Sequence, residues 1–287
     1  MDDLYGAASG RERTLVIPMA DENPIRRMPW ATIVLILTCC AVYFAVQPGR
    51  HTLDQVFDPT VQQTTSNELR FIVNYAAIPC EITQGRPLTN REFRNTYEFG
   101  ETSSCDHGDD HSGPHAPGKS VYLALLLTLF LHGSPQHLFG NMLFLWVFGN
   151  NIEDRRGPLR FLLLYLAAGI VATLAQVLSA PNSTVPIIGA SGAIAGVRGA
   201  YLVCYPAARV KSVIFFGPVL LRKVRASWLL ILWLAAQFLY VNSDVAWAAH
   251  LGGFAFGALV GAFWRWRETQ ARGVLPPPAS EPEPVLR

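Results

Sequence analysis

The feature that most constrains this chain is a series of apolar runs separated by shorter polar segments. Charged residues make up only 15% of the 287 residues, against about 25% in an ordinary soluble domain. The first run, 31–46, is short, and the flanking Pro29 and Trp30 extend it toward the roughly 20 residues that a bilayer span needs. Five further spans are expected at about 135–152, 159–179, 187–204, 227–241 and 246–264.

The runs predict an all-α fold, a polytopic membrane protein with a bundle of six transmembrane helices. We expect a cytoplasmic segment at 1–28, a six-span domain at 29–266, an outer loop at about 49–133 and a disordered cytoplasmic tail at 267–287, which is rich in Pro and Glu. The first run lacks a convincing cleavage site and is interpreted as a retained signal anchor. Within the outer loop, 121–131 is expected to be a short reentrant or interfacial helix.

Positive charge is distributed unevenly around the runs. The short loops at 180–186 and 242–245 contain no Lys or Arg. The segments on the other side hold Arg26, Arg27, Arg155, Arg156, Arg160, Arg209, Lys211, Arg222, Lys223, Arg225, Arg265, Arg267 and Arg272. The positive-inside rule therefore predicts both termini in the cytoplasm and the outer loop outside. A net charge of +2 is too small to indicate nucleic acid, and the bare tails favour a bacterial plasma membrane.

A serine lies among small residues in the fourth run. The segment Gly189-Ala-Ser191-Gly192 is followed by Ala193-Ile-Ala-Gly196, so helix packing explains it as readily as chemistry does, because small-xxx-small patterns are common in membranes. The longer GxSxG elbow of soluble hydrolases is absent, since Ala193 occupies its last position.

A histidine lies in the sixth run, beside a row of glycines. Gly253, Gly257 and Gly261 follow His250 at intervals of three and then four residues, so all four share one face of a helix. Glycines on one face let another helix approach closely, and His250 would lie on that contact face. A lone helical histidine is more often a packing residue, but this placement favours contact with a partner.

Two further polar residues lie near the start of the second span. His137 and Asn141 are four residues apart and point to one side of a helix, where the alternative role is hydrogen bonding to backbone carbonyls between helices. Under the predicted topology these two residues, Ser191 and His250 all lie roughly 3–10 Å below the outer surface. Four polar groups at one depth predict one site, because a serine nucleophile needs a base and its oxyanion needs donors.

The sequence resembles the rhomboid intramembrane serine proteases over nearly the whole length from the first span to the sixth. The residues that carry the resemblance are His137-Leu-Phe-Gly-Asn141, Phe148-Gly-Asn-Asn-Ile-Glu153-Asp154-Arg155, Gly189-Ala-Ser-Gly-Ala-Ile-Ala-Gly196 and Ala249-His-Leu-Gly-Gly253 with Gly257. The resemblance implies a Ser191–His250 dyad without a third acid and an oxyanion hole that includes His137 and Asn141. It also implies single-span transmembrane substrates and helix packing through Gly189, Gly192, Gly196, Gly253 and Gly257. No metal or cofactor is implied.

Three positions depart from the family pattern. Many rhomboids place an aromatic residue where this chain has Ala195, so His250 must be held in another way. A Trp-Arg pair common in the first outer loop is missing here. Arg198 occupies a usually apolar position about 10 Å deeper than Ser191. We expect it to reach toward the cytoplasmic side and to pair there, with Glu153 as the candidate partner.

The outer loop holds side chains that are common metal ligands. Between residues 80 and 119 these are Cys80, Cys105, His107, Asp109, Asp110, His111 and His115. The same stretch is rich in Gly, Ser and Pro, so a flexible loop is favoured over a metal site. A Cys80–Cys105 disulfide is an open alternative, because the loop would face an oxidising compartment. Asp244, just before the sixth span, is a weak candidate for a third member of the triad.

Two other classes of function fit this sequence less well than a protease does. A non-catalytic rhomboid-like protein that binds membrane clients would be expected to lose the serine or the histidine, and this chain keeps both. A transporter or channel would be expected to show internal repeats or charges along a path, and Arg198 is the only clear charge inside a predicted span. The sequence therefore favours a serine endopeptidase that cuts membrane proteins near the outer face of the bilayer.

Overall fold

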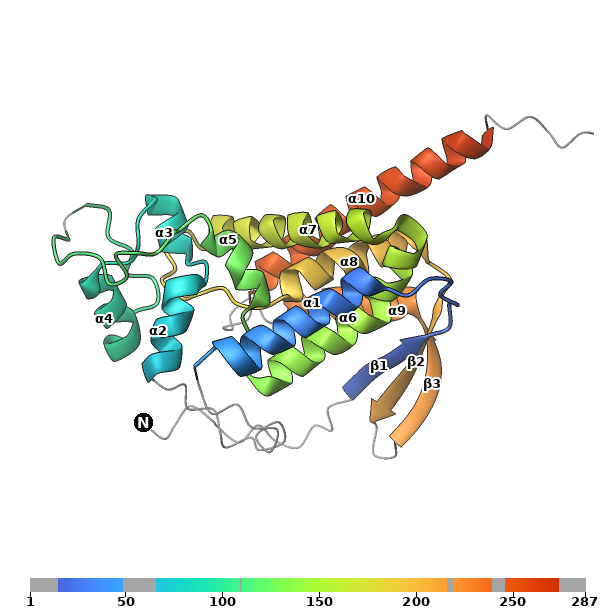
Figure 1. Cartoon of the computed structure of the whole chain (residues 1–287), viewed down its shortest axis with the longest axis horizontal. Coiled ribbons are helices and arrows are strands. Elements are labelled where there is room, and N and C mark those ends of the chain that lie inside the picture. Colours follow the sequence, from blue (N-terminus) through green and yellow to red (C-terminus); the bar gives the residue numbers. More distant parts are fainter. Residues whose placement is uncertain (1–14, 49–65, 109, 216–218, 239–245, 274–287) are drawn as a thin grey trace, which may run out of the picture.

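The computed structural model describes residues 15–48, 66–108, 110–215, 219–238 and 246–273 (Figure 1). The chain is mostly helical. Its elements in order are β1 (Leu15–Asp21), α1 (Trp30–Ala41), the π-helical turn η1 (Val42–Val46), α2 (Ser66–Tyr75), α3 (Pro79–Gln84), α4 (Asn90–Phe99), α5 (Ala124–Leu127), the 3-10 turn η3 (Thr128–Phe130), α6 (Pro135–Arg156), α7 (Pro158–Ser179), α8 (Ser191–Cys204), β2 (Arg209–Phe215), β3 (Val219–Arg225), α9 (Ala226–Gln237) and α10 (Trp247–Gly273).

Helix α8 is the centre of the helical bundle. Every residue from Gly192 to Tyr201 is buried, because α6, α7 and α10 pack around it, and α1 lies on α6 (Figure 1). Gly and Ala fill much of its surface, so the neighbouring helices approach its backbone. Large side chains from those neighbours, such as Phe148 and Phe161, complete the core.

Glycines set the distance between α8 and α10. A methyl group at Gly257 would overlap the carbonyl oxygen of Gly196, and one at Gly253 would overlap that of Gly192. A methyl group at Gly196 would collide with the Ala168 side chain of α7. Close van der Waals packing through small residues is how helices associate where lipid removes the hydrophobic driving force.

Two helices are long and apolar enough to cross a membrane, at 158–179 and 247–271. The apolar helices at 30–46, 191–204 and 226–237 are shorter. Length and hydropathy thus identify two spans among the described residues, and the six-span arrangement stays a prediction. The expected fourth span, 187–204, begins as a helix only at Ser191, because the preceding residues form an extended segment in which Ile187 bridges to Ala77.

A small sheet corrects the expectation of an all-α fold. Strands β1, β2 and β3 form an antiparallel sheet in that order, and β1 comes from the segment 1–28 that was expected only as a polar N-terminal stretch. In β2 the side chains of Val210 and Ser212 are buried, whereas Lys211 between them is exposed. The basic residues of this hairpin were interpreted as loop charges, so the two-residue alternation of a strand was not predicted.

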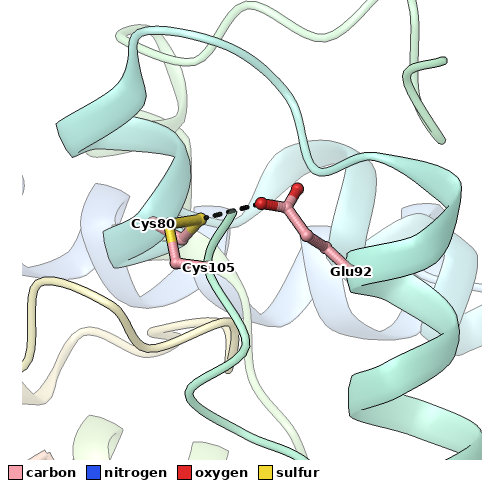
Figure 2. Close-up of side chains that lie close together, drawn as sticks. All are labelled: Cys80, Glu92 and Cys105. Carbon is pink, nitrogen blue, oxygen red and sulfur yellow. Dashed lines mark hydrogen bonds between the residues drawn. A yellow bond between two sulfur atoms is a disulfide. The ribbon is translucent and has the colours of Figure 1, made fainter. Parts of the chain in front are cut away.

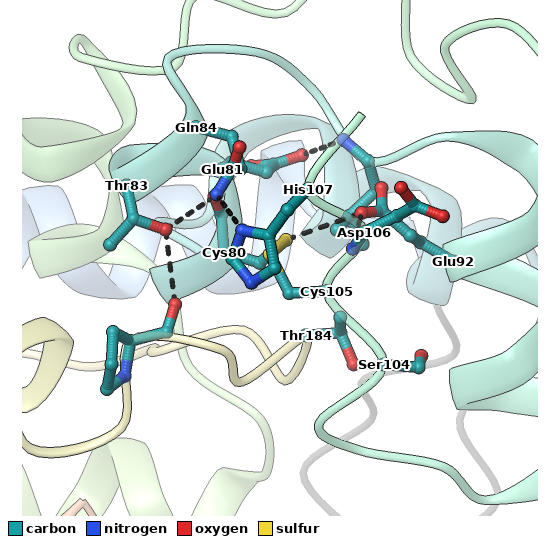
Figure 3. The surroundings of a disulfide bond; sticks show 12 residues. Cys80, Glu81, Thr83, Gln84, Glu92, Ser104, Cys105, Asp106, His107 and Thr184 are labelled. Carbon is teal, nitrogen blue, oxygen red and sulfur yellow. Dashed lines mark hydrogen bonds between the residues drawn. A yellow bond between two sulfur atoms is a disulfide. The ribbon is translucent and has the colours of Figure 1, made fainter. Parts of the chain in front are cut away.

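The described part of the outer loop, residues 66–119, folds into what we call the outer subdomain. Helices α2, α3 and α4 lie at the end of the bundle opposite the sheet (Figure 1). A disulfide joins Cys80 to Cys105 (Figure 3), and a capping box between Thr89 and Glu92 starts α4. The expectation of a flexible loop is therefore wrong for these residues, because cross-links and caps order a segment that its composition alone would leave loose.

Helix α10 extends beyond the predicted boundary of the six-span domain at residue 266. It is helical through Gly273 and projects past the bundle (Figure 1). Glu268 on this extension forms ion pairs with Arg155 and Arg156 at the end of α6. The first part of the expected disordered tail is thus helical, and residues 274–287 lie outside the described part of the chain.

Candidate active site

Ser191 is the first residue of α8, and the turn before it is shaped by glycine. Gly189 has φ +111, a conformation that side chains other than glycine rarely adopt. A methyl group there would lie 2.7 Å from the His137 ring. The prediction that Gly189 is a helix-packing glycine is therefore wrong. It is a turn glycine that brings Ser191 next to α6. The first N–H groups of a helix have no partner within it, so the start of α8 offers free donors beside the serine.

His250 meets Ser191 across the α8–α10 contact. Its Nε2 atom lies 2.9 Å from Ser191 Oγ, within hydrogen-bonding distance for a base and a hydroxyl nucleophile. Gly192 and Gly253, which follow the two residues in their helices, are in backbone contact. The close approach of the two helices is thus what places these side chains together.

The other imidazole nitrogen is held by α9. His250 Nδ1 lies 2.6 Å from Gln237 Oε1, and the Gln237 Nε2 donates to the Trp233 carbonyl at 3.1 Å. Because the amide nitrogen is used in that bond, the atom facing His250 is the amide oxygen, an acceptor, so Nδ1 carries the proton. Nε2 then presents its lone pair to Ser191. The Trp233 ring also packs on the imidazole, with centroids 5.6 Å apart.

This arrangement shows how His250 is held in a chain that has Ala195 where many rhomboids have an aromatic residue. Gln237 was not among the residues predicted for the site, although an amide in the otherwise apolar end of α9 was a readable signal. Gln237 is buried, and a buried polar side chain in an apolar helix needs a partner. Gln237 and Trp233 thus hold His250 in a chain that has Ala195 in place of an aromatic residue.

His137 and Asn141 lie near the start of α6. The Ser134 hydroxyl caps this helix and accepts a hydrogen bond from the His137 N–H at 3.1 Å. Asn141 is buried, and its Nδ2 has no hydrogen-bond partner among the described residues. Both side chains line the same cavity as Ser191 and His250. An unsatisfied buried amide donor is costly unless a ligand completes it, so this donor is free for an oxygen in the cavity.

The cavity has a volume of about 950 Å³. Its deeper wall includes Phe144, Arg198 and Trp233, and its rim includes Pro79 and Thr102 of the outer subdomain. The segment 180–188, which leads into Ser191, forms another side and is tied to the outer subdomain by backbone hydrogen bonds. The site is thus a pocket in which polar groups from three bundle helices surround one serine.

Arg198 does not pair with Glu153, and that expectation is corrected. Its guanidinium lies 3.7 Å from the Phe144 ring centre and 4.3 Å from the Trp233 ring centre. Glu153 is occupied elsewhere, since its carboxylate accepts hydrogen bonds from the N–H groups of Ala31 and Thr32 at the start of α1. A helical side chain leans toward the N-terminus of its helix, so Arg198 points toward Ser191 rather than toward the opposite end of α8.

Residues 119–267 match the Rhomboid domain family, and this stretch covers more than half of the sequence. The chain belongs to the rhomboid family. Membership makes it a membrane protein, and the whole of the cavity wall from Gln136 to His250 falls within the rhomboid domain.

Several curated proteins resemble part of this chain. "Rhomboid protease GluP" of Bacillus subtilis is 35% identical over 140 residues, which cover 49% of this chain and 24% of that protein. "Rhomboid protein 1, mitochondrial" of Saccharomyces cerevisiae is 30% identical over 166 residues, 53% of this chain and 46% of that protein. "Presenilin-associated rhomboid-like protein, mitochondrial" of Bos taurus is 33% identical over 141 residues, covering 48% and 37%. The match thus spans less than half the length of each of these relatives.

Of the candidate metal ligands of the outer loop that the structure describes, only Cys80 and Cys105 belong to a group of three possible ligand side chains. His115 stacks on Phe93, with ring centres 3.6 Å apart, and His107 Nδ1 lies 2.9 Å from the Gln84 amide. Asp109 lies outside the described residues, as does Asp244. Within the described part of this rhomboid chain, one group of three possible ligand side chains lies together, Cys80, Glu92 and Cys105 (Figure 2).

That group is a cross-link rather than a ligand set. The two sulfurs are bonded to each other and offer no thiolate, which is the form that binds metal. Glu92 is engaged by Arg86 at 2.8 Å and accepts from the Asp106 N–H at 2.7 Å. Burial penalises the charged carboxylate, but these partners lower the pKa of Glu92 below its usual value. The carboxylate therefore fixes the chain around the disulfide.

Proposed function

We propose that this chain is a serine endopeptidase that cuts transmembrane segments of membrane proteins within the bilayer, near its outer face. The observation that carries the proposal is the 2.9 Å contact between Ser191 Oγ and His250 Nε2 at the wall of a large cavity. The retained pair favours this proposal over a non-catalytic rhomboid-like protein. Single-span proteins and the lipid bilayer are its proposed partners.

The proposed reaction needs only the chain and water. His250 Nε2 takes the Ser191 proton as the oxygen attacks the scissile carbonyl, and the imidazolium then protonates the leaving amine. Gln237 accepts a hydrogen bond from Nδ1–H throughout, which stabilises the imidazolium and keeps the ring oriented. Water in the cavity then hydrolyses the acyl-enzyme. The mechanism uses no metal or cofactor.

The oxyanion is proposed to form between α6 and the start of α8. The Asn141 amide, the His137 ring and the Ser191 N–H are the proposed donors. Asn141 Nδ2 is buried without a partner among the described residues, which suits a donor that becomes satisfied in the transition state. Two such groups on α6 and one on α8 would surround the oxygen from different directions.

The proposed topology is six spans, α1 and α6 to α10, with both termini in the cytoplasm of a cell whose plasma membrane holds the chain. Its support is the separation of two regions along the bundle (Figure 1). The outer subdomain lies at one end, and its disulfide is of the kind that persists in an oxidising compartment. The sheet with Arg209, Lys211 and Lys223 lies at the other end, as the positive-inside rule requires.

The first experiment is cleavage of single-span test substrates by the purified chain in liposomes, beside Ser191→Ala and His250→Ala. Exposed Arg94→Met serves as a control for substitution in general, and thermal unfolding establishes that each variant is folded. Cleavage by the parent and by the control, with none by the two site variants, supports the dyad. If the parent cuts no substrate and a fluorophosphonate fails to label Ser191, the protease proposal is wrong and client binding replaces it.

Two further substitutions test the supporting residues. Asn141→Ala should lower the cleavage rate by about 10²–10³-fold, as loss of one oxyanion donor does, and an unchanged rate removes Asn141 from the site. Gln237→Leu should lower kcat roughly tenfold, a part of the 10²–10⁴-fold that a positioned base supplies. Gln237→Glu keeps a carbonyl-type acceptor toward Nδ1 and should retain more activity than Leu. Equal losses in Leu and Glu would contradict the positioning role.

A further inference from the structure

Arg198 is a buried cation without an anionic partner among the described residues. Its side chain is 4% exposed, and no ion pair or hydrogen bond joins it to another described residue. An isolated charge removed from water is costly unless it is paired. Contacts with two aromatic rings offset part of this cost, but they leave the N–H groups of the guanidinium unsatisfied.

Two aromatic rings lie against Arg198. The central carbon of its guanidinium is 3.7 Å from the ring centre of Phe144 on α6 and 4.3 Å from that of Trp233 on α9. Contacts with rings satisfy none of the N–H groups of a guanidinium, and those groups can bind a carboxylate in a fork. Nε is buried and has no partner among the described residues.

Arg198 lies in the wall of the active-site cavity. Arg198 lines the same cavity as Ser191, His250 and Asn141, and its side chain leans up the helix toward the serine. The guanidinium of Arg198 is therefore closer to Ser191 than the roughly 10 Å of helix that separates the two residues along the axis. A side chain that enters the cavity beside a peptide bond held at Ser191 therefore extends toward this cation.

We propose that Arg198 is a subsite for a carboxylate side chain, and that the enzyme selects substrates with Asp or Glu next to the scissile bond. This inference rests on the proposed protease function and adds a substrate class to it. Acidic residues are rare in transmembrane segments because they are costly in lipid. A cation in the cavity would stabilise such a residue as it leaves the lipid, so the subsite would make a rare feature the basis of selection.

The test uses single-span substrates that differ only in one residue beside the cleavage site, Asp against Asn and Glu against Gln. The parent is compared with Arg198→Met, with Arg198→Lys and with Arg222→Met, a control that removes an exposed arginine from β3 in the sheet. Initial rates give kcat/KM for each pair. The rate of Ser191 labelling by an uncharged fluorophosphonate reports on the dyad without using the subsite.

We expect the parent and Arg222→Met to cut the acidic substrate about 10- to 100-fold faster than its amide counterpart, the range for a hydrogen bond to a charged group. Arg198→Met should lose this preference while Ser191 is still labelled, and Arg198→Lys should keep part of it. Equal rates for acid and amide in the parent would overturn the proposal. A loss of the same size for both substrates in Arg198→Met would overturn it too, since that is the result of a structural role.

A binding measurement keeps the test decisive if Arg198→Met does not fold. Ser191→Ala protein, which keeps Arg198, should bind the acidic substrate at least about tenfold more tightly than the amide one, and equal affinities overturn the subsite. Failure of the protease proposal gives a different result, in which the parent cuts neither substrate and Ser191 is not labelled.

Discussion

Two regions of this molecule are held together by opposite means. Where α8 meets α10, glycines bring backbones into contact, and methyl groups at Gly253 or Gly257 would overlap the facing carbonyl oxygens. In the outer subdomain, the Cys80–Cys105 disulfide and the ion pair between Arg86 and Glu92 link short helices. One region relies on the absence of side chains and the other on covalent and ionic links.

The difference follows from length and surroundings. Helices α8 and α10 are 14 and 27 residues long, so they make an extended contact in which small gains of dispersion energy add up. Helix α3 has 6 residues and cannot form a stable helix alone, so links from distant parts of the chain must order it. The dyad belongs to the first region and the rim of the cavity to the second, which predicts that the two can be disturbed separately.

The largest effect is expected from Gly257→Val, which inserts a branched side chain where α10 touches the Gly196 carbonyl oxygen. The helices must separate, so we expect loss of Ser191 labelling and of most folded protein in a thermal unfolding assay. Gly140→Ala in α6 is the matched stability control, because a methyl group there meets nothing within 4 Å. A Gly257→Val protein with parental unfolding temperature would show that the close contact is not needed.

Removal of the disulfide should affect only the second region. In Cys80→Ser with Cys105→Ser we expect the outer subdomain to lose about 2–4 kcal/mol of stability and to be cut faster by added trypsin. The rate of Ser191 labelling should stay near that of the parent, because the α8–α10 contact sets the dyad. A large fall in labelling would show that the two regions are coupled and that the comparison is wrong.

A smaller effect is expected from Arg86→Met. The change leaves Glu92, which is almost fully buried, without its cation, but the N–H groups of Thr89 and Asp106 still donate to its carboxylate. We expect a loss of about 1–3 kcal/mol in the outer subdomain, seen as faster proteolysis at residues 66–119. Arg94→Met removes an exposed arginine from α4, the helix that holds Glu92, and should change nothing. Equal proteolysis of the two variants would remove the ion pair from the explanation.

Acid should loosen the outer subdomain before the bundle. Burial opposes the charge of Asp110, but the Thr89 hydroxyl, Ser112 and Arg91 lower its pKa to about 2 from 3.8. A lowered carboxyl pKa stabilises the fold above the unfolded value, and this contribution is lost as pH falls from about 4 to 2. Proteolysis of the outer subdomain by pepsin should therefore accelerate over this range, and Asp110→Asn should flatten the response. A response that is unchanged in Asp110→Asn would contradict this assignment.

Much of the bundle could be predicted because apolar runs report directly on helices. The expected ranges 135–152 and 159–179 lie within α6 and α7, and the polar groups at one depth line one cavity. The outer subdomain could not be predicted, because its order depends on contacts between residues far apart, such as Cys80 and Cys105. No local pattern carries that information.

Two polar residues of the bundle, Arg198 and Gln237, were misjudged for physical reasons. Arg198 was expected to reach away from Ser191, but side chains on a helix lean toward its N-terminus, and two aromatic rings were available there. Gln237 was passed over because it lies in an apolar run, although the amide in such a run is the informative residue. In both cases the polar exception was more useful than the apolar pattern around it.

The carboxylate of Glu153 also has a consequence for the order in which the chain is assembled. Helix α1 has Pro29 before it and no side-chain cap of its own, and the N–H group of Thr32 is satisfied by a residue 121 positions further on. At 5–20 residues per second of synthesis, about 6–24 s pass between the two. Helix α1, the first helix in the described part of the chain, thus gains these hydrogen bonds only after residue 153 has been made. A ribosome that stalls before residue 153 leaves the N–H groups of its first turn without this acceptor.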